Sequence, residues 1–141
     1  MTITPKLMIL AILAALVSFA PPPAHAGATD PLFINLISDE GHRASMALGF
    51  GAKQLKRGHP LTVFLNDRAV AVAAKENAEK YAAQHKAIGE LLAAGAVILV
   101  CPMCMKHYGV AETSLLPGLK VGNPELTGGQ LFKDDTKTLT W

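Results

Sequence analysis

Two cysteines, Cys101 and Cys104, are the residues of this chain with the greatest capacity for chemistry, and only Pro-Met separates them. A disulfide between them would close a very short loop and remove little entropy from the unfolded chain, so it would stabilise the fold weakly. Thiolates attack sulfur atoms and bind soft metal ions. The spacing therefore predicts a reactive or metal-binding site rather than a structural cross-link.

A buried strand and a short helix must position these cysteines. Residues 96–100, Ala-Val-Ile-Leu-Val, are typical of a central parallel strand that is covered on both faces. The polar segment that follows predicts a helix that stops at Gly109. Cys101 would then lie where backbone N–H groups and the helix dipole favour a thiolate. Lys106 and His107, one turn further along, would add positive charge.

The rest of the domain alternates between apolar runs and helical patterns. The predicted strands are residues 32–37, 61–65, 96–100, 119–121 and 136–141. The predicted helices are residues 42–57 and 79–94, with a short helix or an ordered loop at 69–75. Residues 126–132 have no assigned structure because of the pair Gly128-Gly129. Alternating strands and helices predict an α/β fold, a three-layer sandwich around a mainly parallel five-stranded sheet.

Polar clusters follow the first three predicted strands, where ligands of open α/β sheets collect. The clusters are residues 38–42, 66–68 and 101–104. In a flavodoxin-like strand order the first and third strands are neighbours, and His42 would then lie near Cys101. We interpret Asp67 and Arg68 as a surface turn.

The first 26 residues predict a secretory signal peptide. A charged start at Lys6 precedes an apolar run, residues 7–20, and a cleavage site ending at Ala26. The run is shorter than the roughly 20 residues that cross a bilayer. We expect a periplasmic or secreted mature domain, residues 27–141, with no stable membrane anchor after cleavage.

Charge is nearly balanced over the chain, with 13 basic and 11 acidic residues. No basic stripe of the kind that binds phosphate backbones is present. The composition therefore gives no reason to expect a nucleic-acid partner.

The segment from Cys101 to Val110 resembles the active-site loop of the DsrE/DsrF-like proteins, the sulfur-relay group that includes DsrEFH and TusBCD. In that family a Cys ends the third strand, and a Gly-hydrophobic pair follows at the distance of Gly109-Val110. Several single-domain members carry a second Cys at the Cys104 position. Weaker similarity extends to residues 38–43, 117–121 and 138–141.

The resemblance implies a flavodoxin-like fold, commonly assembled as trimers or hexamers, and a sulfur-carrier or sulfurtransferase role without a cofactor. Cys101 would hold a persulfide and pass its outer sulfur on, and Cys104 could resolve it as a disulfide. His42, Lys106 and His107 are candidates for binding the sulfur species. The implied partners are sulfur donor and acceptor proteins or small sulfur species.

Two other chemistries remain open for the same loop. Thiolate and thioether ligands select Cu(I), and imidazole tolerates it, so a copper site is one alternative. Its soft donors would be Cys101, Met103, Cys104, Met105 and His107. Zinc fits less well, because a structural site uses four Cys or His ligands. The other alternative is thiol–disulfide exchange, since Cys-x-x-Cys at a helix start is a redox geometry.

Overall fold

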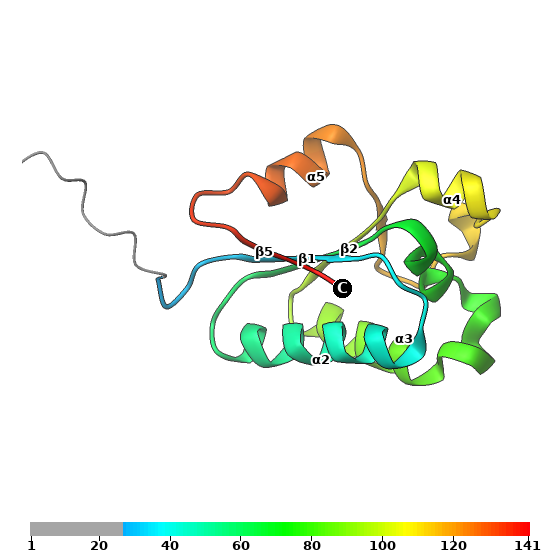
Figure 1. The fold of residues 1–141 in the computed structure, drawn as a ribbon, viewed down its shortest axis with the longest axis horizontal. Helices are drawn as coiled ribbons and strands as arrows, with labels where there is room; N and C mark the ends of the chain where they lie inside the picture. The colour runs from blue at the N-terminus through cyan, green and yellow to red at the C-terminus, as the bar shows by residue number, and fades with distance from the viewer. Residues whose placement is uncertain (1–26) are drawn as a thin grey trace, which may run out of the picture.

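A parallel sheet forms the centre of the computed structural model, which describes residues 27–141 (Figure 1). Its strand order is β4-β3-β2-β1-β5. The strands are β1 (Leu32–Leu36), β2 (Leu61–Leu65), β3 (Val97–Val100), β4 (Lys120–Val121) and β5 (Lys137–Thr140). The predicted signal peptide, residues 1–26, lies outside the described residues.

Helices cover both faces of this sheet and complete a three-layer α/β fold. Figure 1 shows α2 and α3 on one side of the sheet and α4 and α5 on the other. The α-helices are α2 (Gly41–Lys56), α3 (Ala78–Ala93), α4 (Pro102–Tyr108) and α5 (Pro124–Leu131). The 3₁₀ turns are η1 (Asp67–Ala73), η2 (Lys75–Asn77) and η3 (Glu112–Ser114). No helix between residues 27 and 141 is long and apolar enough to cross a membrane.

The central strands are buried on both faces, as their apolar runs predict. Ile34 of β1, Val63 of β2 and Val100 of β3 are fully buried in the core shared with the helices. On the opposite face, Phe33 and Leu99 are also buried. The α/β prediction and the five-stranded parallel sheet are confirmed.

One stretch without a predicted structure, residues 126–132, lies mostly within α5. The helix starts before the Gly-Gly pair that obscured it. Asn123 accepts a hydrogen bond from the Leu126 N–H at 2.7 Å, and Pro124 occupies the first turn. The N-cap residue and the proline in the first turn favour a helix here, and they outweigh the low helix propensity of the two glycines.

The expected adjacency of the first and third strands is wrong. β2 lies between β1 and β3, with Leu65 paired to Leu36 on one side and to Val100 on the other. Because α2 and α3 cover the same face, two right-handed crossovers step in the same direction across the sheet (Figure 1). The loop after β2, rather than the loop after β1, is therefore the neighbour of Cys101.

Close packing of α2 on the sheet predicts a position-dependent response to larger side chains. A Cβ at Gly51 would lie 2.9 Å from Leu61 Cδ2 and 3.1 Å from Ile34 Cδ1, whereas nothing lies within 4 Å of one at Gly49. Both G51V and G49V place the same residue in the interior of α2. We expect G51V to be less stable than G49V by about 1–3 kcal/mol in urea unfolding, because only Gly51 faces the core. Equal stabilities would contradict this packing.

Candidate functional site

Cys101 lies at the junction between β3 and α4, as the sequence predicts. Its N–H donates to the Leu65 carbonyl of β2 at 3.0 Å. Its sulfur caps the helix, accepting a hydrogen bond from the Cys104 N–H with the two atoms 3.4 Å apart. The side chain is buried, with 4% of the residue exposed. Gly109, in the left-handed region at φ 71°, ends α4 where the sequence predicts a stop.

The Cys104 thiol contacts the loop that follows β2. Its Sγ donates to Asn66 Oδ1 at 2.9 Å and accepts from the Asp67 N–H at 3.2 Å. Cys104 is half-buried, and both cysteines are free thiols. The two sulfur atoms therefore have different partners: the sulfur of Cys101 accepts within α4, and that of Cys104 is bound to the β2 loop.

The β2 loop is fixed in place by two further hydrogen bonds and by the backbone conformation of Asp67. Asn66 Oδ1 also accepts from the Asp67 N–H at 2.9 Å. The Tyr108 hydroxyl, at the end of α4, donates to Asp67 Oδ1. Asp67 itself has φ 47°, a left-handed conformation that Asp tolerates better than most residues. Asn66 and Asp67 are thus anchored against both ends of the helix that carries Cys104.

Burial is the main reason that the pKa of the Cys104 thiol lies above its ordinary value. The neighbouring Cys101 thiol raises this pKa further, and the Asp67 N–H acts in the opposite direction. Similarly, the pKa of Tyr108 is raised mainly because its hydroxyl donates to the Asp67 carboxylate. Cys104 is therefore protonated at neutral pH.

A cavity of about 330 Å³ lies beside Cys101. No charged side chain lines it, and its walls are mostly apolar. The lining residues are Phe64, Cys101, Pro102, Met103, Gly122, Asn123, Pro124 and Thr127. Gly122 packs closely against this wall, because a Cβ there would lie 2.8 Å from Thr127 Oγ1 and 3.4 Å from the Val100 carbonyl oxygen. Cys101 borders the cavity, whereas Cys104 faces the β2 loop.

Three predicted substrate-binding residues lie outside this cavity. His42 is exposed in the first turn of α2, where its N–H donates to Glu40 Oε1 at 2.9 Å. Lys106 and His107 are exposed on α4, and the His107 ring packs edge-on against Tyr108 with centroids 4.7 Å apart. Their role in binding sulfur species stays a prediction.

The soft donors of the copper hypothesis do not all face one point. Met105 is buried in the core, while Met103 is 79% exposed at the cavity. In the part of the chain that the structure describes, no three His, Cys, Asp or Glu side chains are grouped as metal ligands. Copper binding and thiol–disulfide exchange stay predictions.

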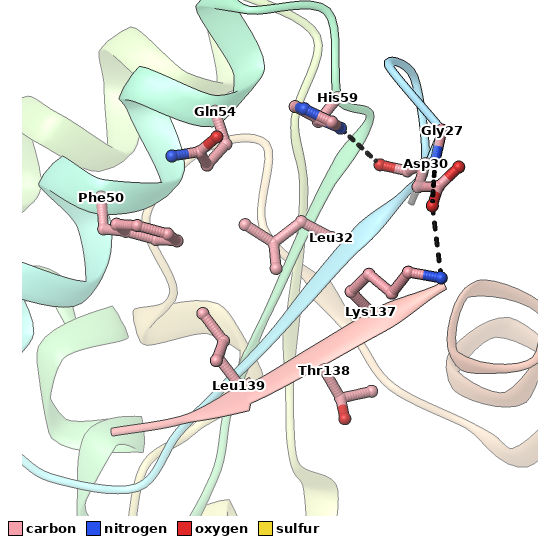
Figure 2. A pocket seen from close by; sticks show the side chains of 9 residues that line it. All are labelled: Gly27, Asp30, Leu32, Phe50, Gln54, His59, Lys137, Thr138 and Leu139. Atoms are coloured by element: carbon pink, nitrogen blue, oxygen red, sulfur yellow. Dashed lines mark hydrogen bonds and ion pairs between the residues drawn. The ribbon is translucent and has the colours of Figure 1, made fainter. Parts of the chain in front are cut away.

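A second pocket, of about 240 Å³, lies at the opposite end of the sheet (Figure 2). Leu32, Phe50 and Leu139 form an apolar wall there. At its rim Asp30 accepts from the Gly27 N–H at 2.8 Å and pairs with Lys137 at 3.2 Å. The Gly27 contact is the main reason that the pKa of Asp30 is lowered. No cysteine lines this pocket, so the cysteine site remains the better candidate for sulfur chemistry.

The sequence analysis placed the polar cluster of residues 66–68 at a strand end, but it did not predict that Asn66 and Asp67 contact Cys104. Asp67 is exposed, in keeping with a surface turn, yet its N–H contacts Cys104. Asn66 and Tyr108 carry no motif of their own. The available signal was their position: Asn66 follows a buried strand, and that strand pairs with the one that ends at Cys101.

Three solved structures share the fold. They are the conserved protein of unknown function BT1422 from Bacteroides thetaiotaomicron, the YchN protein from E. coli and the protein of unknown function MTH1491 from Methanobacterium thermoautotrophicum. The TM-scores are 0.61, 0.61 and 0.62, at sequence identities of 22%, 17% and 14%. The alignments cover 79%, 80% and 79% of this chain and 95%, 99% and 99% of the others.

Sequence comparison gives the family. No curated protein matches the chain. The model of the DsrE/DsrF-like family matches residues 15–134, a range that includes all of β1 to β4 and both cysteines. This match agrees with the Cys-to-Gly spacing of the loop and with the shared fold. The chain belongs to the DsrE/DsrF-like family.

Proposed function

We propose that this protein is a periplasmic sulfur-relay component that carries sulfane sulfur as a persulfide on Cys101. Family membership supports a role of the sulfur-relay type. The predicted signal peptide, residues 1–26, supports the periplasmic location. The sulfur would arrive from a donor protein or a small sulfur species and leave to an acceptor thiol.

The observation that carries this proposal is the position of the Cys101 thiol beside the cavity. Cys101 ends a central strand, so its backbone is held rigidly by β2. The cavity offers space next to the sulfur for one more sulfur atom and for part of a donor. Cys104, bound to Asn66, does not line this space.

Transfer by this route conserves atoms and electrons. The Cys101 thiolate attacks the outer sulfur of a donor persulfide, the donor S–S bond breaks, and the donor leaves as a thiolate. A new S–S bond then joins Cys101 to the transferred sulfur. An acceptor thiolate attacks that outer sulfur in turn and restores the Cys101 thiolate. No external oxidant or reductant is consumed.

Persulfide formation should depend on Cys101 and not on Cys104. After treatment of the fully reduced protein with polysulfide, we expect wild type and C104S to gain the mass of sulfur, and C101S to gain none. Intact-mass spectrometry of the anaerobic protein gives the readout, and serine keeps a helix-capping oxygen at position 101. Unlabelled wild type with verified free thiols would end the proposal.

The uncharged cavity should disfavour an anionic donor. Thiosulfate carries two negative charges, and no lining side chain offsets the cost of bringing them into an apolar space. We expect T127K, which adds a cation to the lining, to accelerate thiosulfate labelling of Cys101 by about tenfold. T113K adds the same charge at an exposed position in η3 and is the control. Equal acceleration by both variants would mean that the cavity is not the route.

A further inference from the structure

We infer that Asn66 is a positioning residue that holds the Cys104 thiol back from the Cys101 persulfide, so that the bound sulfur is not lost as sulfide. This inference rests on the proposed function and adds to it a means of retaining the cargo. It assigns a role to the β2 loop, which the persulfide step itself does not use.

The need for such a residue follows from the spacing of the two cysteines. The backbone nitrogen of Cys104 lies 3.4 Å from the Cys101 sulfur, so the residue that carries the second thiol is in direct contact with the reacting atom. A free Cys104 thiolate would be a nearby nucleophile in every persulfidated molecule. Proximity of this kind strongly accelerates a reaction.

The unwanted reaction is an internal exchange. The Cys104 thiolate attacks the Cys101 sulfur, the S–S bond of the persulfide breaks, and the outer sulfur leaves as hydrosulfide. A Cys101–Cys104 disulfide forms. The two cysteine sulfurs are oxidised and the sulfane sulfur is reduced by the same two electrons, so no further reactant is needed. The carrier would lose its cargo and end in an inactive disulfide.

The contacts of Cys104 oppose this exchange. Its S–H donates to Asn66 Oδ1 at 2.9 Å, a bond that only the protonated thiol can make. Attack requires loss of that proton and of that bond. The raised pKa of Cys104, caused mainly by burial, acts in the same direction. The Asp67 N–H favours the thiolate, but it also holds the sulfur at the β2 loop, at 3.2 Å.

The position of Asn66 is set by the ends of two secondary structures. Its N–H donates to the Leu36 carbonyl at 2.8 Å, which continues the β1–β2 ladder. The next residue, Asp67, is tied to Tyr108 at the far end of α4. The Asn66 side chain therefore projects from a backbone that is fixed beside α4. Its position does not depend on the contact with Cys104.

The test measures how long the loaded protein keeps its sulfur. Wild type, N66S, N66D and N66S/C104S are persulfidated with polysulfide, freed of excess reagent and followed for sulfide release and intact mass. Serine keeps an oxygen near the start of η1 but is too short to reach Cys104. We expect N66S to release sulfide about fivefold faster than wild type, because loss of one ordinary hydrogen bond changes a rate by about this factor. The product should be the Cys101–Cys104 disulfide.

Two variants separate positioning from general damage to the fold. N66D retains an acceptor for the Cys104 proton, so we expect it to release sulfide no faster than wild type. In N66S/C104S the attacking sulfur is absent, and retention should return to the wild-type level. Loaded C104S should keep its sulfur about as long as wild type, because wild-type Cys104 is already held back. The comparison of C104S with wild type tests the inference even if the Asn66 variants do not fold.

Three results would overturn the inference while leaving the proposed function intact. They are sulfide release from N66S at the wild-type rate, rapid release from N66S/C104S, and release from wild type much faster than from C104S. By contrast, wild type that takes up no sulfur would overturn the proposed function itself, and the inference with it.

Discussion

The parallel pairing of β2 with β3 is the constraint on which the site depends. Leu65 and Val100 are partners at the carboxyl ends of these strands, and the Leu65 carbonyl accepts from the Cys101 N–H. Parallel strands end at the same edge, so whatever follows β2 must meet whatever follows β3. That single register brings Asn66 to Cys104 and leaves Cys101 beside the cavity. A one-residue shift of either strand would turn the core side chains of that strand to the opposite face of the sheet.

Local patterns were sufficient to predict most of the elements and the position of the cysteines. A buried run at residues 96–100 and a glycine at position 109 define β3 and the end of α4 in the sequence itself. The start of α5 was equally local, at Asn123 and Pro124, but the following glycines masked it. Strand order was not predictable in this way, because it depends on which face each crossover helix covers.

The site was predictable only where its residues are neighbours in sequence. Cys101 and Cys104 share one turn of helix, whereas the contact between Cys104 and Asn66 spans 38 positions. Nothing in the residues around Asn66 distinguishes a ligand of a thiol from an ordinary turn residue. The expectation of His42 near Cys101 assumed that the first and third strands are neighbours, and β2 lies between them.

The Cys101 sulfur also has a structural role, because it accepts the hydrogen bond that caps the start of α4. Reaction at that atom and order in the first helical turn are therefore thermodynamically linked: each modification of the sulfur changes its strength as a cap. Replacement by alanine removes the thiol and the cap together. The local stability of α4 should therefore depend on the chemical state of the Cys101 sulfur.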